Sequence, residues 1–300
     1  MENFFITGAT GFIGKHLIKA IDGNIKILSR SPLKDYESVI CELGVELIPK
    51  DALNNIQTII HLAGVAHNKF NDKNTDLYYK VNIDATIELA NLAVKSGVKN
   101  FVFISSVKAG GRSFDGSRVN EQDHFEPEGI YGKTKREAEL RLLEISKISG
   151  MNITIIRPSL VCGPNVKGNL KKMFQGIKSG WFPPLPETNN KKSIIHVDDL
   201  VQAILLVLKD NRTNGEIYIA TDDVSYSSRN IYTIMCKLAG KPIPKWTVPK
   251  LFFDILGLFS PNIKYKVDKL LGDEYYSSGK LKKLGFRPQK TLENMNETIF

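Results

Sequence analysis

The feature that most constrains this chain is a glycine loop near its start, "FITGATGFIG" at positions 5–14. The apolar run Asn3–Thr7 before it suits a buried strand, and Gly11–Ile21 after it carries apolar residues at helical spacing. Because glycine has no Cβ, such a loop permits a sharp turn, close approach of a pyrophosphate to the backbone, and tight packing of helix on strand. Free N–H groups at the helix N-terminus would bind the phosphates. The loop therefore predicts a dinucleotide site that includes Gly8, Gly11 and Gly14.

The next expected strand, Asn24–Arg30, indicates which dinucleotide binds. It ends roughly twenty residues beyond the loop, where an Asp or Glu typically binds the ribose 2′-hydroxyl of NAD. Ser29 and Arg30 stand there instead. A hydroxyl and a guanidinium can bind a 2′-phosphate that a carboxylate would repel, which favours NADP(H). NAD(H) remains the alternative, because sites without the carboxylate also accept it.

Further along, apolar runs alternate with amphipathic stretches. Thr58–Ala63, Asn100–Ser106 and Asn152–Pro158 are typical of strands covered on both faces of a parallel sheet. Helices are expected over Asp76–Ser96 and Gly129–Ser149, each followed by a glycine. The alternation predicts the α/β class with a Rossmann-like, doubly wound parallel sheet. The apolar positions of the first helix are Leu77, Val81, Ile87, Leu92 and Val94.

The pattern becomes less regular after about residue 158, and prolines cluster at 183–186 and 242–249. We expect residues 1–165 to form the NAD(P)-binding domain. Residues 166–300 would form mainly a small C-terminal substrate-binding lobe, with some elements returning to the sheet. Within it, the apolar stretch Leu251–Phe259 favours a packed helix over a membrane-surface patch, because so short a run buries little area.

Catalytic chemistry is indicated by Tyr131 and Lys135, four residues apart on an expected helix and therefore on one face of it. A phenol has a reference pKa of about 10, and an ammonium beside it would favour the phenolate. Ser106 ends a strand at the sheet edge where ligands bind. We expect Tyr131 to exchange a proton with a substrate oxygen that Ser106 also contacts, while a nicotinamide exchanges hydride with the adjoining carbon.

Composition narrows the other possibilities. The 300 residues are 42% hydrophobic and 24% charged, which is typical of a globular protein, and no apolar run approaches the ~20 residues of a membrane span. The net charge of +9 fits a diphosphate substrate as well as a nucleic acid, and we expect the former. Cys41, Cys162 and Cys236 lack the spacing of a disulfide framework or a zinc site. These features, and the absence of a leader after Met1, make the cytoplasm the expected location.

Four histidine-containing features have simpler interpretations than catalysis. His61 lies inside an apolar strand and is expected to be a hydrogen-bonded core residue. His196, with Asp198 and Asp199, is expected to end a strand and cap a helix, so no metal site is expected. His67 follows a strand end and is a candidate sugar contact. The long polar stretch Gly110–Gly129 is expected to be a substrate-side loop that orders on binding.

The segments "TGATGFIG", "IIHLAG", "ISS", "YGKTK" and "RPSLVCGP" resemble, in order and spacing, the extended short-chain dehydrogenase/reductase family of nucleotide-sugar epimerases, dehydratases and reductases. "SSVKAGG", "GPNVKGNL" and "KKSIIHVDDL" resemble a bacterial UDP-glucose 4-epimerase-like branch that includes reductases making UDP-N-acetylquinovosamine. The resemblance implies a site of Ser106, Tyr131 and Lys135, with Lys135 also binding the nicotinamide ribose and Asn82 supporting the site. It implies cofactor contacts at Gly8, Ala9, Thr10, Gly11, Phe12, Ile13, Gly14, Leu62, Ala63, Gly64, Pro158 and Val161. It implies substrate contacts at His67, Ser106, Lys108, Val166, Lys167, Asn169 and Lys192.

Departures from the family pattern refine this expectation. Val107 and Lys108 replace the Asp and Glu with which the dehydratases eliminate water, which argues against dehydratase activity. Cys162 stands where the family has a tyrosine and opens space near the sugar. Lys192 replaces the usual diphosphate-binding arginine and offers a point charge without a bidentate fork.

The expected function is NAD(P)-dependent oxidation or reduction at C4 of a nucleotide-diphosphate sugar, with reduction of a UDP-4-keto-6-deoxy-N-acetylhexosamine favoured. A UDP-sugar 4-epimerase with tightly bound NAD is the alternative. A non-catalytic NADP-sensing regulator would be expected to lose Tyr131 or Lys135, and both are present. A flavonoid or steroid carbonyl would need an apolar cleft, not one with Lys167 and Lys192. The resemblance also suggests a homodimer formed through the helices 76–96 and 129–149.

Overall fold

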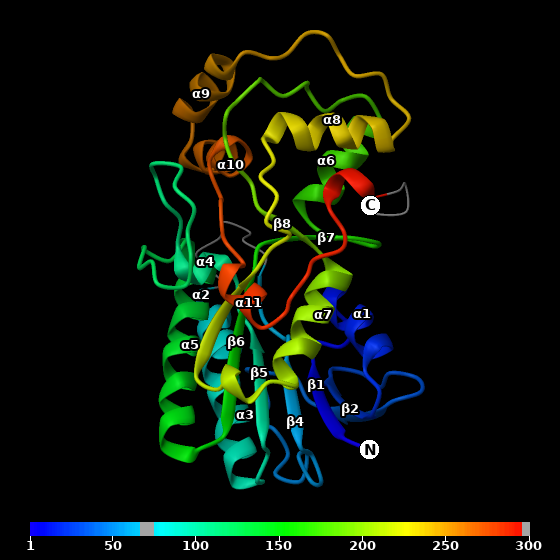
Figure 1. Ribbon diagram of the computed structural model, residues 1–300, viewed down its shortest axis with the longest axis vertical. Coiled ribbons are helices and arrows are strands. Elements are labelled where there is room, and N and C mark those ends of the chain that lie inside the picture. Colours follow the sequence, from blue (N-terminus) through cyan, green and yellow to red (C-terminus); the bar gives the residue numbers. More distant parts are fainter. Residues whose placement is uncertain (67–74, 296–300) are drawn as a thin grey trace.

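The computed structural model describes residues 1–66 and 75–295, and its centre is a seven-stranded sheet (Figure 1). All neighbouring strands are parallel, in the order β3-β2-β1-β4-β5-β6-β9. This order reverses between β1 and β4, as in doubly wound dinucleotide-binding sheets, and confirms the predicted fold class. The strands are β1 (Asn3–Thr7), β2 (Asn24–Ser29), β3 (Glu37–Ile40), β4 (Thr58–His61), β5 (Asn100–Ile104), β6 (Asn152–Pro158) and β9 (Glu216–Ala220).

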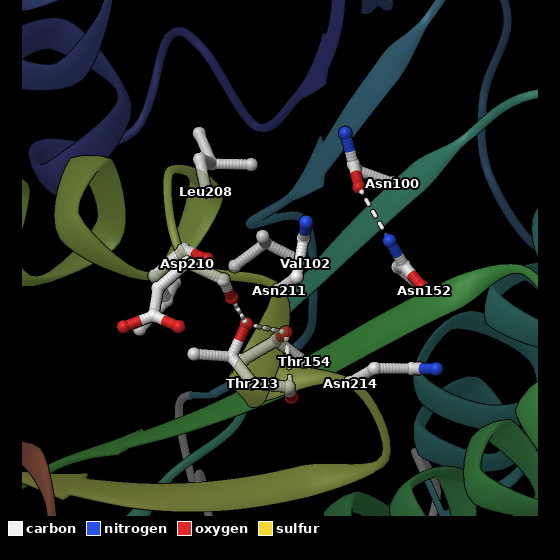
Figure 2. A pocket seen from close by; sticks show the side chains of 10 residues that line it. Asn100, Val102, Asn152, Thr154, Leu208, Asp210, Asn211, Thr213 and Asn214 are labelled. Atoms are coloured by element: carbon white, nitrogen blue, oxygen red, sulfur yellow. Dashed lines mark hydrogen bonds between the residues drawn. The ribbon is translucent and has the colours of Figure 1, made fainter. Parts of the chain in front are cut away.

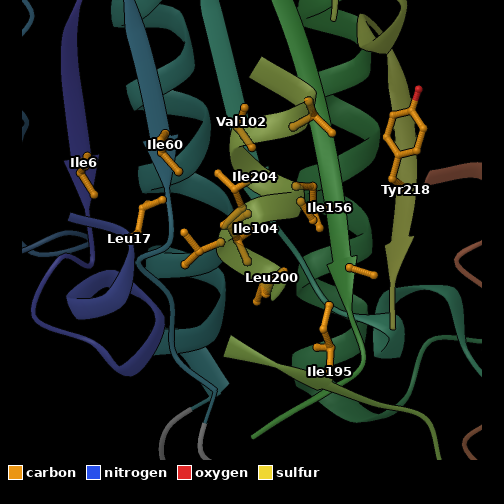
Figure 3. Packing of buried hydrophobic residues seen from close by; sticks show 14 of the residues in the cluster. Ile6, Leu17, Ile60, Val102, Ile104, Ile156, Ile195, Leu200, Ile204 and Tyr218 are labelled. Carbon is orange, nitrogen blue, oxygen red and sulfur yellow. The ribbon is translucent and has the colours of Figure 1, made fainter. Parts of the chain in front are cut away.

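Helices cover both faces of the sheet, which explains why its inner strands are apolar on both sides. On one face, α1 (Phe12–Ala20) and α7 (Val197–Leu208) pack against the strands, and Leu17, Ile60 and Ile204 meet there (Figure 3). On the other, α3 (Ala85–Lys95) and α5 (Gly129–Ser149) bury residues such as Leu89 and Leu142. The two layers fix the strand ends on which the predicted site residues lie.

The expected helix Asp76–Ser96 is divided by a π-helical turn. It consists of α2 (Thr75–Tyr79), the π-helical turn η2 (Lys80–Asp84) and α3, whose end at Ser96 and Gly97 agrees with the prediction. The expected apolar face was partly wrong, because Leu77 and Val94 are exposed. The π turn contains one residue more than an α turn, so residues before it are offset from the face that continuous helical spacing predicts. Small residues form much of the buried face of α3. The buried residues of α3 are Ala85, Thr86, Leu89, Ala90 and Ala93.

Beyond the sheet lies a smaller lobe with its own apolar cluster, which includes Phe174, Leu185, Tyr226 and Met235. Two short parallel strands, β7 (Leu160–Cys162) and β8 (Ile194–His196), lead into it. The proposed domain boundary at residue 165 remains a prediction. The lobe helices are α6 (Asn169–Lys178), α8 (Ser228–Leu238), α9 (Lys250–Leu258) and α10 (Pro261–Leu271). The remaining short elements are α4 (Val107–Gly110), η3 (Asn211–Thr213), α11 (Gly279–Lys283) and η4 (Leu292–Asn294).

The helix predicted at Leu251–Phe259 exists as α9, but the interpretation that it is packed into the lobe is only partly right. Phe253 and Gly257 are its buried residues, while most of its large apolar side chains are exposed. Nothing in the described part of the chain forms a helix both long and apolar enough to cross a membrane. The three cysteines are buried and free, in agreement with the absence of a disulfide framework.

Candidate active site

The glycine loop leaves no room for side chains. Gly8 has a φ of +73°, and a Cβ on it would lie 2.7 Å from the Ala63 nitrogen. A Cβ on Gly14 would lie 2.3 Å from the Gly8 oxygen, so helix α1 can approach β1 only with glycine there. Gly11 caps α1 with no side-chain hydrogen bond, which leaves the first-turn N–H groups for an anion. The residues present therefore fit the pyrophosphate of a dinucleotide.

The neighbouring strand ends supply the rest of the predicted cofactor surface. Ser29 ends β2 and its hydroxyl donates to the Ser31 oxygen at 2.5 Å, while Arg30 is exposed beside it. After β4, the Ala63 N–H donates to the Thr7 hydroxyl at 3.2 Å. A Cβ on Gly64 would lie 3.4 Å from Lys135 Nζ, so this segment lies between the glycine loop and the predicted catalytic lysine.

The structure brings the three predicted catalytic residues together at the carboxyl end of β5. Ser106 follows this strand and caps α4, its hydroxyl accepting from the Lys108 N–H at 3.3 Å. Tyr131, in the first turn of α5, shares a hydrogen bond with the Ser106 side chain. One turn later, Lys135 donates to the Ile104 oxygen at 2.8 Å and lies 4.2 Å from the centre of the Phe103 ring. A substrate oxygen at this edge would meet both hydroxyls.

The acidities in this group differ from those expected. Burial raises the pKa of Tyr131 to about 12, against the opposing effect of the Ser106 hydrogen bond. Burial also lowers the pKa of Lys135 to about 7, although the Glu139 carboxylate acts in the other direction. The expected lowering of the phenol pKa by the lysine is not found, because the ammonium is directed to the Ile104 oxygen and the Phe103 ring. The raised pKa favours the neutral phenol of Tyr131, which is the form that can donate a proton.

His61 is a core residue, as predicted. Its Nδ1 lies 2.6 Å from the Thr7 hydroxyl and its Nε2 lies 2.9 Å from the Thr86 hydroxyl. Burial, followed by the nearby Lys135, lowers the pKa of His61 to about 3, so the ring is neutral. It is the last residue of β4, but its ring is completely buried, where it links β1, β4 and α3 by hydrogen bonds and is not exposed to substrate.

Asn82 lies in the π-helical turn and supports the segment after β4. Its side-chain oxygen accepts from the Val65 N–H at 2.8 Å. Its nitrogen donates to the Val65 oxygen and to the Thr134 hydroxyl, both at 3.1 Å. These bonds hold the backbone beside the glycine loop against α5, which is the supporting role that the resemblance implies.

Sequence analysis missed a buried ion pair behind the site. Arg157 of β6 donates to both oxygens of Glu139 on α5, at 2.9 and 2.6 Å, and the two side chains are 2% and 0% exposed. The pair fixes α5 one turn beyond Lys135. The available signal was a glutamate four residues after Lys135, on the same helical face.

A charged cluster lies on the other side of Ser106, where the lobe approaches. We use this name for Lys108, Glu128, Lys192, Lys269 and Glu274. Lys192 pairs with Glu274 at 3.1 Å and also donates to the Lys269 oxygen, so the expected diphosphate contact has its own counterion.

The rest of the charged cluster is less completely paired. Lys108 and Glu128 are 4.0 Å apart, and Glu128 Oε1 is buried with no hydrogen-bond partner in the described residues. Burial, and then the Glu274 carboxylate, raises the pKa of Glu128. Burial, and then the Lys108 ammonium, lowers the pKa of Lys269. These groups have hydrogen-bonding capacity left for a polar ligand.

The other predicted contacts are spread around this edge. Lys167 and Asn169 are exposed at the start of α6, whereas Val166 packs in the lobe core. Pro158 ends β6 and is buried, and Val161 in β7 is partly exposed. His67 lies outside the described residues.

Two further predictions can be located. His196 ends β8 and caps α7, accepting from the Asp198 N–H at 3.2 Å, as predicted. Within the described ranges no cluster of potential metal ligands was found. The other prediction is the substrate-side loop Gly110–Gly129, which follows α4. Within it Val119 is buried and its N–H donates to the Tyr275 oxygen at 2.9 Å, while ordering of the loop on binding stays a prediction.

A separate small pocket lies at the opposite edge of the sheet (Figure 2). Its polar lining is already satisfied internally: Asn152 donates to Asn100 at 3.2 Å and the Thr154 and Thr213 hydroxyls are 3.0 Å apart. Because β5 and β6 begin there, it is remote from Ser106 and Tyr131 and carries no candidate chemistry.

Comparison with known proteins places this geometry in a family. Residues 4–220 match the model described as the NAD dependent epimerase/dehydratase family. The chain belongs to this family. It is therefore an enzyme, and the resemblance to the extended short-chain dehydrogenases/reductases is confirmed.

Three similar proteins illustrate the match. UDP-glucose 4-epimerase from Vibrio cholerae is 31% identical over 97% of this chain and 92% of its own length. N-acetyl-alpha-D-glucosaminyl-diphospho-ditrans,octacis-undecaprenol 4-epimerase from Escherichia coli O157:H7 is 29% identical over 99% of this chain and 94% of its own. The structure of MoeE5 in complex with UDP-glucuronic acid and NAD is 21% identical, with a TM-score of 0.79, over 97% of this chain and 95% of that one. The last likeness shows the shared fold.

Proposed function

We propose that this enzyme reduces a 4-keto nucleotide sugar, with a UDP-4-keto-6-deoxy-N-acetylhexosamine as the substrate class. The arrangement that carries the proposal is the Tyr131 phenol beside Ser106, at the sheet edge that the glycine loop shares. Reduction of a ketone needs a proton donor at its oxygen, and a phenol with a pKa of about 12 holds its proton at neutral pH. The names of the Vibrio and Escherichia relatives support a sugar diphosphate and position C4.

Each residue has a defined part in this reaction. The glycine loop and the segment after β4 would hold the cofactor, which would supply hydride chemistry at C4 when bound. Tyr131 gives its proton to the C4 oxygen, and the Ser106 hydroxyl donates a hydrogen bond to the same oxygen. Lys135 binds the cofactor ribose, and its own pKa of about 7 allows it to replace the proton that Tyr131 gives up. Asn82 holds the segment after β4 to α5, and the ion pair of Glu139 and Arg157 holds α5 to β6.

Substrate selection is assigned to the charged cluster and to the start of α6. The incompletely paired Lys108, Glu128 and Lys269 favour a polar sugar over an apolar flavonoid or steroid. Lys167 and Asn169 are exposed where a diphosphate would enter, and Lys192 would contact it while remaining paired with Glu274. His67 is retained as a proposed sugar contact.

A 4-epimerase with tightly bound NAD is the second candidate. The names of both relatives support it. Epimerisation begins by taking a proton from the sugar hydroxyl, so it requires the phenolate of Tyr131, which burial disfavours in this structure. The raised pKa of Tyr131 therefore favours reduction over epimerisation.

The remaining assignments extend the same proposal. We place the enzyme in the cytoplasm as a homodimer formed through α2 to α3 and α5. The outer surfaces of these helices form a shallow depression lined by Tyr79, Ile83, Asp84, Lys133, Glu137 and Arg141. A second copy would cover it.

The test follows absorbance at 340 nm of the purified full chain with NADPH and a UDP-4-keto-6-deoxy-N-acetylhexosamine. Stoichiometric loss of NADPH with formation of the reduced sugar is expected. If no NADPH is consumed and the protein already carries cofactor, UDP-glucose and UDP-N-acetylglucosamine are assayed for inversion at C4. Inversion would replace the reductase by the epimerase, and inactivity with all three sugars would overturn the proposed function.

NADP(H) preference is tested through Arg30. Its exposed guanidinium would bind the 2′-phosphate, so Arg30→Ala should raise KM for NADPH about tenfold and leave KM for NADH unchanged. Arg212→Ala, which alters an exposed arginine in η3, is the control. Equal KM values for NADPH in both variants would contradict the preference.

A further inference from the structure

The outer face of α9 is unusually apolar for a solvent-facing helix. Leu251, Phe252, Ile255, Leu258 and Phe259 are all exposed. Their spacing at i, i+1, i+4, i+7 and i+8 places them on one side of the helix. Scattered exposed apolar residues are ordinary, but a continuous face of this kind marks an interaction surface.

Packing of α9 within the lobe does not account for this face. Phe253 points into the lobe core, and α9 meets α10 at Gly257, where a Cβ would lie 3.5 Å from the Lys264 Cα. The inner side of the helix thus makes its tertiary contacts. Figure 1 shows α9 at the outer end of the lobe, far from the amino ends of the sheet strands. The exposed side chains therefore face outward.

The stretch of chain that contains α9 is basic and carries further exposed aromatic and aliphatic side chains. Trp246 and Ile243 precede α9, and Ile263 in α10 follows it. Asp254 and Asp268 are the only acidic residues between positions 241 and 271. The exposed lysines of this stretch are Lys241, Lys245, Lys250, Lys264 and Lys266.

We propose that α9 docks this enzyme onto an anionic lipid bilayer. A short amphipathic helix with Phe and Leu on one side and lysines beside it lies in the plane of a membrane interface, where apolar side chains enter below the headgroups. The lysines attract the anionic headgroups, and Trp246 has the amphipathic ring that suits the same depth. At nine residues α9 is too short to span, so the attachment is peripheral and reversible.

Vesicle co-sedimentation of the full chain tests this proposal without any substrate, so its result is independent of the proposed reaction. The probe is a vesicle of phosphatidylcholine with one third phosphatidylglycerol. The wild-type chain should sediment with it, and the double variant Leu258→Ser, Phe259→Ser should bind at least tenfold more weakly. Both positions are exposed, so folding should be unchanged. Leu47→Ser is the matched control, because Leu47 and Leu258 are both 84% exposed and Leu47 lies outside the lobe.

Changes in protein charge, salt and lipid charge distinguish docking on anionic lipid from nonspecific hydrophobic adsorption. Lys245→Gln with Lys250→Gln should weaken binding severalfold, because both lysines are exposed close to Trp246 and the start of α9, and 0.5 M salt should do the same to the wild-type chain. Vesicles of phosphatidylcholine alone should bind little protein. Absence of sedimentation with anionic vesicles would overturn the proposal, as would equal binding by the Leu258→Ser, Phe259→Ser variant. A different result is also informative. If the wild-type chain forms an oligomer that does not bind vesicles, and the Leu258→Ser, Phe259→Ser variant is monomeric, the proposal is overturned and the face is an interface between copies.

Discussion

Ion pairs are built differently in the sheet layer and in the lobe. Arg157 of β6 and Glu139 of α5 form a bidentate ion pair that is almost completely buried. In the lobe, Arg229 pairs with Glu187, whose side chain is 78% exposed. The first pair is shielded from water and fixes two elements of the fold, while the second is screened by solvent. The buried pair therefore positions two elements of the fold, whereas the pair with the exposed Glu187 should contribute little to stability.

The Glu139→Gln variant should show the largest effect. It leaves the Arg157 cation buried without a counterion, so the free energy of unfolding should fall by about 3–5 kcal/mol. Urea denaturation measures the change. Glu37→Gln, whose 70% exposed side chain pairs with Lys26, is the control and should lose less than about 1 kcal/mol. Similar losses in the two variants would remove the contrast between buried and exposed pairs.

Tyr131→Phe tests whether the sheet side carries the chemistry. It removes the proton donor and leaves the ring, so kcat should fall on the order of 10²-fold or more while NADP(H) affinity stays nearly unchanged. Steady-state kinetics and a cofactor-binding titration provide the two values. Full activity of the Tyr131→Phe enzyme would be incompatible with the proposed mechanism.

Burial of the Lys135 ammonium should lower the free energy of unfolding by an amount that depends on pH. Its pKa is lowered from 10.5 to about 7 by burial, so between these values the unfolded chain holds a proton that the folded chain lacks. The free energy of unfolding therefore rises with pH between about 7 and 10.5. Below pH 7 the buried lysine is charged, and the protein bears the whole destabilisation.

Lys135→Met removes this cost. Because one pKa unit corresponds to about 1.4 kcal/mol, the variant should be more stable than the wild-type chain by roughly 2 kcal/mol or more at pH 6. The gap should close towards pH 10. Denaturation at both pH values measures this difference, with Lys209→Met, which alters an exposed lysine at the end of α7, as the control. A gap that is constant with pH would mean that the lysine is not desolvated.

Glu187→Gln in the lobe should have the smallest effect. Its partner Arg229 also donates to the Leu185 and Pro244 oxygens, so the guanidinium keeps hydrogen bonds when the carboxylate is lost. We expect a loss below about 1 kcal/mol in the free energy of unfolding. A loss as large as that of Glu139→Gln would show that the lobe pair is also structural.

Sequence reasoning succeeded where one local rule decides the outcome. The glycine spacing and the strand before it fixed the first β-α unit, and continuous apolar runs identified inner strands such as Asn100–Ile104. Ser106, Tyr131 and Lys135 meet because a strand end and a helical turn place them, and both follow from local periodicity. The same reasoning correctly assigned His61 to the core.

It failed where several distant segments decide the outcome together. The acidity of Tyr131 depends on where the Lys135 ammonium turns, and that depends on the Ile104 oxygen and the Phe103 ring. Glu274 is far from Lys192 in sequence, so their pairing could not be anticipated. The exposure of α9 was also missed, because an apolar run carries no sign of which neighbours will cover it.

The π-helical turn η2 also bears on changes in chain length. A π turn holds one residue more than an α turn. Deletion of a single residue within Lys80–Asp84 would therefore permit a plain α-helix through this stretch, with α2 and α3 nearly unchanged in relative orientation. The bulge that now presents Asn82 to the Val65 backbone would be lost. A shortening that looks harmless in an alignment would therefore free the segment after β4 from the catalytic helix.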